Sequence, residues 1–120
     1  MLNLDTHIVV EGLIGGLSKR ELELVEGVPV AISDIVLWEI SKLVQRKRIS
    51  IDIDSAAFKR FLRQATVYPI TLEIARQSTA LDFRSDPADE IIAATSVVEN
   101  IPLLTRDKKI RRSKIVPLAK

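Results

Sequence analysis

The sequence predicts a single α/β domain built on a mainly parallel β-sheet. Short runs of valine, isoleucine and leucine alternate with longer segments of helical periodicity, and this alternation continues along the whole chain. The chain has 120 residues, of which 47% are hydrophobic, and this is enough for one core. We therefore expect one domain over residues 1–120, with right-handed crossovers that place helices on both faces of the sheet in three layers, α/β/α.

The elements follow one another in a regular order. Five short apolar runs, at residues 2–4, 28–32, 67–70, 101–104 and 115–118, are predicted to be strands buried on both faces. Candidate helices lie at about residues 7–15, 18–25, 34–46, 55–64, 72–81 and 87–99. Ser33 or Asp34 can cap the third helix, and Asp86-Pro87-Ala88-Asp89 supplies an N-cap, a proline at the first helical position and an acid in the first turn.

The composition excludes several kinds of site. With no cysteine, the chain cannot form disulfides, a zinc-thiolate site or a thiol nucleophile. The single histidine, His7, rules out a multi-histidine metal site and argues against a Ser-His-Asp triad. Asp5, His7 and Glu11 interrupt the apolar N-terminal stretch before it reaches the length of a signal peptide or a membrane span, so we expect a cytoplasmic protein without membrane association.

Three aspartates are predicted to meet at one edge of the sheet. Asp5 directly follows the first strand, Asp107 follows the fourth, and Asp89 lies in the first turn of the helix before that strand. Ligands of open α/β sheets gather at the carboxyl ends of the strands, where these acids are expected. Each of them also has a purely structural interpretation, as a helix cap, a turn residue or a first-turn acid that interacts with the helix dipole.

Glu39 is the most informative acid, because its neighbours at helical spacing, Val36 and Leu43, are apolar. A carboxylate on an inward face must be paired, protonated or bound to a cation. Four carboxylates about 5 Å apart would repel one another by roughly 3 kcal/mol per pair. A hard divalent ion removes that repulsion, suits oxygen ligands and retains waters that can attack phosphorus, so the four acids predict a phosphoryl-transfer site.

Basic residues form two clusters that can contact a phosphate backbone or simply form a solvated surface. Their members are Arg46, Lys47 and Arg48 in the first cluster and Lys108, Lys109, Arg111, Arg112 and Lys114 in the second. We expect His7 and Trp38 to be packing residues rather than metal ligands or a base-stacking platform.

The combination of motifs resembles a PIN domain, and in particular the VapC toxins of bacterial and archaeal toxin-antitoxin pairs. The resemblance covers nearly the whole chain. Its parts are Leu4-Asp5-Thr6-His7, Ile32-Ser33-Asp34-Ile35-Val36-Leu37-Trp38-Glu39-Ile40, Asp86-Pro87-Ala88-Asp89-Glu90-Ile91-Ile92-Ala93-Ala94-Thr95 and Pro102-Leu103-Leu104-Thr105-Arg106-Asp107.

The resemblance implies a ribonuclease in which Asp5, Glu39, Asp89 and Asp107 surround Mg²⁺, which Mn²⁺ can replace. It also implies that the hydroxyl of Thr105 helps to order the site. Further implications are a five-stranded parallel sheet, a homodimer, RNA as substrate, and a small antitoxin whose C-terminal segment covers the site. Glu90 stands where the family usually has a basic residue, so a contact with substrate or inhibitor at that position is not carried over.

Other functions remain open at this point. A PIN nuclease that processes or repairs nucleic acid without an antitoxin would have the same residues, and so would a catalytically silent interaction domain. Aspartyl-phosphate chemistry is a different enzyme class. His7 stands two residues after Asp5, where a haloacid-type phosphatase needs a second aspartate, so that class is not favoured.

Overall fold

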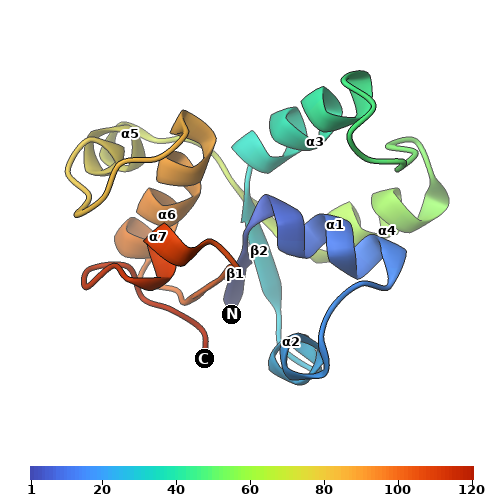
Figure 1. Ribbon diagram of the computed structural model, residues 1–120, viewed down its shortest axis with the longest axis horizontal. Helices are drawn as coiled ribbons and strands as arrows, with labels where there is room; N and C mark the ends of the chain where they lie inside the picture. The colour runs from blue at the N-terminus through green and yellow to red at the C-terminus, as the bar shows by residue number, and fades with distance from the viewer.

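Four parallel strands form the central sheet of the computed structural model, which describes residues 1–120 (Figure 1). They are β1 (Leu2–Leu4), β2 (Val30–Ser33), β3 (Thr66–Tyr68) and β4 (Leu103–Leu104), in the spatial order β3-β2-β1-β4. The strand that begins the chain is therefore central, between β2 and β4. Because all four strands run the same way, their carboxyl ends meet at one edge of the sheet, as the sequence predicts.

The sheet has four strands, not the expected five. The segment at residues 115–118 makes only an isolated parallel bridge, between Leu103 and Leu118. The Leu103 N–H donates to the Pro117 carbonyl (2.9 Å), and the Ala119 N–H donates back to the Leu103 carbonyl (2.9 Å). Pro117 has no N–H with which to extend a ladder, and β4 offers only two residues for pairing, so no regular strand forms.

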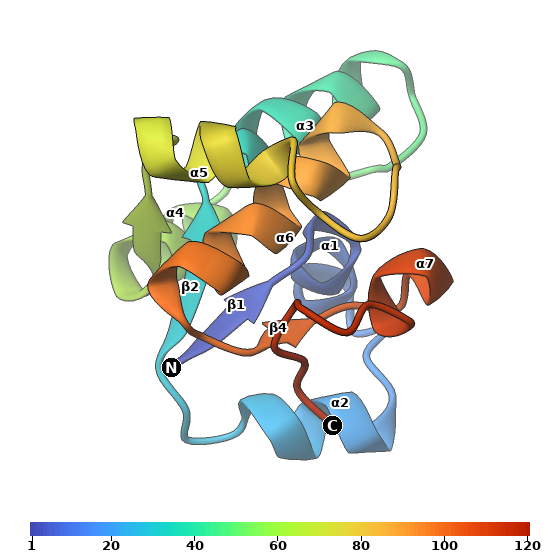
Figure 2. The same ribbon diagram turned by 90° about the vertical axis from the view of Figure 1, so that its left-hand side faces the viewer.

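Helices cover both faces of the sheet. They are α1 (Thr6–Ile14), α2 (Lys19–Val25), α3 (Ile35–Gln45), α4 (Ala56–Gln64), α5 (Leu72–Ser78), α6 (Pro87–Glu99) and α7 (Lys108–Arg111). In Figure 1, α5 and α6 lie to the left of the strands and α1 and α4 to the right, with α3 at the upper right and α2 below. Figure 2 shows α5 and α6 in front of the strands and α1 behind them, which confirms the layered arrangement. No helix is long and apolar enough to cross a bilayer.

The predicted helices are all present, with small differences at their ends. Ser18 and Glu21 form a capping box at the start of α2, and Asp5 caps α1. Asp34 and Asp86 occupy N-cap positions, but neither side chain makes a capping hydrogen bond. The short helix α7 was not predicted, because the basic run that forms it has no apolar periodicity and depends on capping by Asp107.

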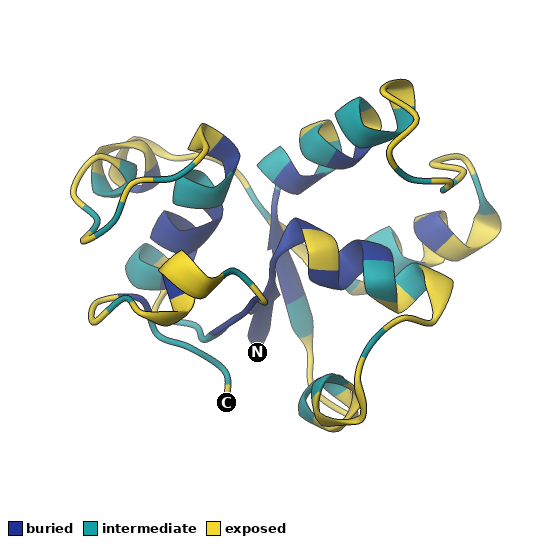
Figure 3. Ribbon diagram, in the orientation of Figure 1, coloured by how far each residue is buried: buried dark blue, intermediate teal, exposed yellow.

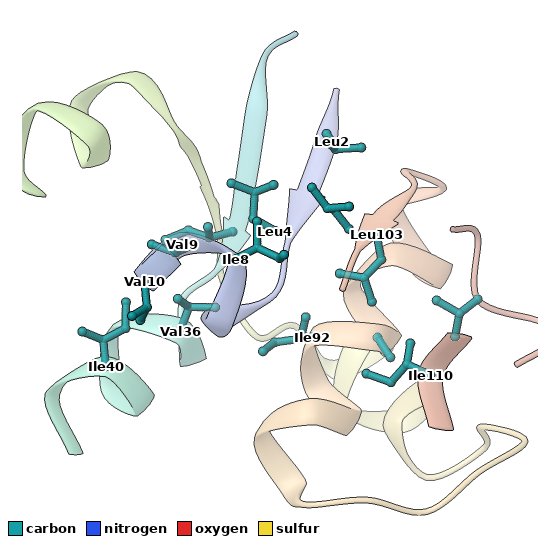
Figure 4. Close-up of a cluster of buried hydrophobic side chains, with 14 of the residues drawn as sticks. Leu2, Leu4, Ile8, Val9, Val10, Val36, Ile40, Ile92, Leu103 and Ile110 are labelled. Carbon is teal, nitrogen blue, oxygen red and sulfur yellow. The ribbon is translucent and has the colours of Figure 1, made fainter. Parts of the chain in front are cut away.

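The hydrophobic core lies where the helices meet the sheet (Figures 3 and 4). Figure 4 shows Ile8 and Val9 of α1 beside Leu4 of β1, and Ile92 of α6 on the other side of that strand. A buried amide crosses this interface: Asn3 donates to the Ser96 hydroxyl (2.9 Å) and to the Ile92 carbonyl (3.2 Å). Since both bonds end on α6, they fix that helix against the central strand.

Candidate functional site

Asp5 is the most deeply buried of the predicted site acids. Its side chain lies at the carboxyl end of β1, is only 3% exposed and accepts a hydrogen bond from the Thr6 N–H (2.8 Å). Its second oxygen accepts a hydrogen bond from the Thr105 hydroxyl (2.5 Å). Burial raises the pKa of Asp5 above its usual value, and the two hydrogen bonds and the charge of His7 oppose that rise.

Thr105 links the ends of β1 and β4. Besides donating to Asp5, its hydroxyl oxygen accepts a hydrogen bond from the Asp107 N–H (3.0 Å). The Asp107 side chain in turn accepts from the N–H groups of Lys109 (2.8 Å) and Ile110 (3.1 Å) and so caps α7. The expected cluster of Asp5, Thr105 and Asp107 is therefore present as one chain of hydrogen bonds.

A Thr105→Val variant is expected to lower the free energy of unfolding by about 1 to 3 kcal/mol at neutral pH, because the buried Asp5 carboxylate loses a donor. The loss should shrink in acid, where Asp5 is protonated. Urea unfolding at both pH values measures the effect. Thr95→Val is the matched control, since the buried Thr95 hydroxyl donates to the Ile91 carbonyl and not to an acid. If Thr105→Val lowers the free energy of unfolding equally at both pH values, the Thr105 hydroxyl does not stabilise the charged form of Asp5.

Glu39 projects from α3 toward the same edge of the sheet, and the Thr6 hydroxyl donates a hydrogen bond to it. Its side chain is half-buried, next to the fully buried Val36 and Ile40 on its helix. An ion pair with lysine or arginine would have been the structural alternative to metal binding. Instead, a neutral hydroxyl holds Glu39, and Thr6, which immediately follows Asp5, connects the two acids.

Asp89 lies in the first turn of α6 and accepts a hydrogen bond from the Ser85 hydroxyl (3.0 Å). Its pKa is raised to about 6 by burial first and then by the negative charges of Asp5, Glu39 and Asp107. The Ser85 hydrogen bond opposes this rise. The four predicted acids are therefore close enough to repel one another, although they come from four separate parts of the chain.

No lysine or arginine forms an ion pair with these acids, and His7 is the one basic side chain whose charge acts on Asp5. The one ion pair of the structure, between Arg106 and Glu21 (2.7 Å), leaves all four of them out. In the side-chain positions of this structure, no three acidic or histidine groups are arranged to hold a single ion, so binding would require some of these side chains to rotate. The donor set nevertheless fits a hard divalent cation, because it consists of oxygens whose mutual repulsion such a cation would remove.

Several interactions at the site were missed by sequence reasoning. The Thr6 hydroxyl donates to Glu39, and the Ser85 hydroxyl donates to Asp89. The available signal in the sequence was a hydroxyl residue close to a candidate acid: Thr6 directly follows Asp5, and Ser85 lies four residues before Asp89. Arg106 was also missed: it donates to the Gly16 carbonyl (3.0 Å) and makes two hydrogen bonds to Glu21, which lower the pKa of Glu21 to about 2.

His7 and Trp38 differ from the expectation that they pack in the core. His7 is exposed, and the Trp38 side chain is 54% exposed. The apolar positions of α3 that do face inward are Val36 and Ile40, and Trp38 lies between them in sequence and so points away from their face. The prediction for these two residues was therefore wrong.

The protein is of the class in which acids from separate chain segments meet at the carboxyl edge of a parallel α/β sheet. The PIN domain family matches residues 3–115, and the chain is a member of that family. Among curated proteins, the chain is similar to ribonuclease VapC22 of Mycobacterium tuberculosis, with 29% identity over 85 residues. The matched region is 68% of this chain and 65% of that relative, so about a third of the relative has no counterpart in the match.

Chains in two solved complexes have the same fold. The VapBC2 complex of Rickettsia felis, bound to a promoter DNA fragment, has a chain that superposes with a TM-score of 0.76 at 23% identity, covering 99% of this chain and 98% of that one. A toxin-antitoxin complex from Klebsiella pneumoniae gives a TM-score of 0.71 at 21% identity and covers 99% and 97%. At these identities the likeness establishes the fold and not the activity.

Proposed function

We propose that this protein is a metal-dependent ribonuclease. The observation that carries the proposal is the convergence of four carboxylates at one edge of the sheet, held by hydroxyl and backbone groups, with no lysine or arginine paired to any of them. Burial and the charges of the other three acids raise the pKa of Asp89 to about 6, in agreement with that convergence. Such an arrangement is costly unless a cation binds there. Membership of the PIN family and the likeness to a protein named as a ribonuclease support cleavage of RNA as the activity.

The proposed roles follow the contacts of the side chains. Asp5, Glu39 and Asp89 hold Mg²⁺, which Mn²⁺ can replace, and Asp107 holds the same ion or a second one through water. When bound, the ion neutralises charge on the phosphodiester and activates water. Thr105, Thr6 and Ser85 orient Asp5, Glu39 and Asp89 through neutral hydroxyls, which fix the carboxylates without cancelling their charge.

We further propose that the chain is a single-domain toxin of the VapC type that acts in the cytoplasm as a homodimer and is inhibited by a small antitoxin. The support is that its structural neighbours come from toxin-antitoxin complexes. A PIN nuclease of RNA processing or repair is the second candidate, and a silent interaction domain is the third. Expression in bacteria separates the first two, because only a toxin should arrest growth and be neutralised by the protein encoded beside it.

The ribonuclease proposal is tested by incubating purified protein with labelled mixed RNA, first with Mg²⁺ or Mn²⁺ and then with EDTA. We expect cleavage with metal and none with EDTA. An Asp5→Asn variant purified in parallel detects contaminating nuclease, because its preparation should be inactive. No cleavage, together with no metal-induced rise in melting temperature, would favour the silent domain.

A further inference from the structure

A groove of about 530 Å³ begins at the acid site and runs along α3. Its walls come from α3, from the start of α1 and from the start of α6, and we call it the α3 groove. Figure 1 shows the first turns of α3 and α6 near each other above the sheet. Glu39 belongs both to the acid site and to this groove. The other lining residues that matter here are His7, Trp38, Lys42, Arg46 and Arg48.

Two carboxylates, Glu39 and Asp86, line this groove together with three cations, so its charge is positive on the side formed by the end of α3. Lys42, Arg46 and Arg48 line it, and none of them is within ion-pair distance of a carboxylate. Lys42 donates only to the Gln45 side chain (3.3 Å). Basic residues in the last turn of a helix interact favourably with its dipole, which accounts for Lys42 and Arg46. Arg48 lies beyond the end of α3, so the dipole does not explain its place in the groove.

Trp38 supplies an exposed aromatic surface in the same groove. It is the only tryptophan of the chain and has more than half of its surface in solvent, beside the unpaired cations. A single exposed aromatic side chain needs no functional explanation by itself, but its position beside three unpaired cations in one groove favours a binding surface. Aromatic rings bordered by arginine and lysine are the common device by which proteins bind unpaired bases together with their phosphates.

We propose that the α3 groove binds single-stranded RNA, with an unpaired base stacked on Trp38 and backbone phosphates on Lys42, Arg46 and Arg48. This inference rests on the proposed ribonuclease function and adds that the substrate must be unpaired next to the cleaved bond. Bases in a duplex stack on one another and cannot lie on Trp38. An acidic peptide could use the cations but would give the exposed indole no partner, so the observations favour RNA.

The direct test is the fluorescence of wild-type protein, since all tryptophan emission comes from Trp38. Oligouridylate is titrated in EDTA, so that binding is measured without cleavage. Stacking should quench the emission, and a duplex of the same length should bind more weakly and quench little. Equal binding and equal quenching by duplex and single strand would overturn the proposal.

Variants assign the interactions, with binding measured by the anisotropy of labelled oligouridylate. Trp38→Ala should weaken binding on the order of tenfold, and Trp38→Phe should restore most of it. Lys42→Gln with Arg46→Gln should weaken binding and reduce the slope of log Kd against log salt by about 0.7 for each phosphate that the protein no longer neutralises. The matched control is Lys59→Gln with Arg63→Gln on α4, which removes the same charges at the same spacing from an exposed face outside the groove.

The outcomes separate this inference from the ribonuclease proposal. Metal-dependent cleavage without quenching, or equal effects of the α3 and α4 double variants, would overturn the groove assignment while the nuclease stands. Quenching and a selective α3 effect without any cleavage would support the groove and count against the nuclease. If oligoglutamate binds the groove more tightly than oligouridylate, the site belongs to an acidic protein segment, and the RNA assignment is wrong.

Discussion

The Asp5→Asn variant is expected to lose RNA cleavage by about 1000-fold or more while it still folds. A catalytic ion contributes several kcal/mol to transition-state stabilisation, and each 1.4 kcal/mol or so corresponds to a factor of ten in rate. Asparagine caps a helix as well as aspartate does and can still accept the hydrogen bond of the Thr6 N–H, so α1 should keep its start. Burial raises the pKa of Asp5, so removing its charge should leave metal-free protein at least as stable.

The measurements for this variant are initial cleavage rates at saturating Mg²⁺, circular dichroism and thermal unfolding. Asp54→Asn is the control, because Asp54 is exposed in the segment before α4 and lies outside the site. It should cleave like wild type. An Asp5→Asn protein that is folded and cleaves within about threefold of wild type would remove Asp5 from the proposed metal ligands, whatever the other acids do.

Metal-free protein should become less stable as the pH rises from about 5 to about 7, and Mg²⁺ should abolish this loss. The pKa of Asp89 is about 6 in the folded protein, above its usual value of 3.8, so the folded state binds more protons than the unfolded state between these values. The free energy of unfolding therefore falls as Asp89 loses its proton. About 1 kcal/mol of this loss falls between pH 5 and pH 7 after allowance for partial solvent screening, and Asp5 adds to it in the same direction.

Urea unfolding at closely spaced pH values, with EDTA or with Mg²⁺, tests this expectation. Glu21 changes the stability in the opposite direction, because its lowered pKa gives stability that is lost as the pH falls. That loss occurs below about pH 4.5 and therefore outside the pH range of this measurement. Mg²⁺ at about 100 times its Kd should stabilise the protein by about 3 kcal/mol at neutral pH. Asp89→Asn should remove most of the pH dependence. A wild-type curve that is flat in EDTA would contradict the repulsion among the four acids.

The sequence predicted the elements that carry strong periodic or capping signals. The α/β alternation indicated the parallel sheet, and the expected placement of Asp5, Asp89 and Asp107 at one edge follows from strand direction alone. The strand at 115–118 was overestimated because apolar content does not reveal whether a neighbour offers enough backbone groups for pairing. The helix α7 was missed because its basic residues carry no period.

Side-chain direction was harder to predict than position. Glu39 was expected to share the face of Val36 and Leu43, and these two are buried and half-buried. Its partner, however, is a hydroxyl from α1, an interaction that depends on how two helices pack. Trp38 was expected in the core because tryptophan is usually buried, and that general tendency contains no information about which face of α3 is left uncovered. The ligands of the site could be proposed from spacing, whereas the groove beside it required the three-dimensional structure.

The order of the strands also determines when the site can exist during synthesis of the protein. Strand β4 is the last to pair with the central strand β1. Directly after β4, Thr105 donates to Asp5, the acid that follows β1, and Asp107 is hydrogen-bonded to Thr105. A nascent chain cannot assemble the four acids until the ribosome has passed Asp107. If the protein cuts RNA as proposed, a nascent chain that has not yet reached Asp107 cannot act as a nuclease on the messenger or the ribosome that produces it.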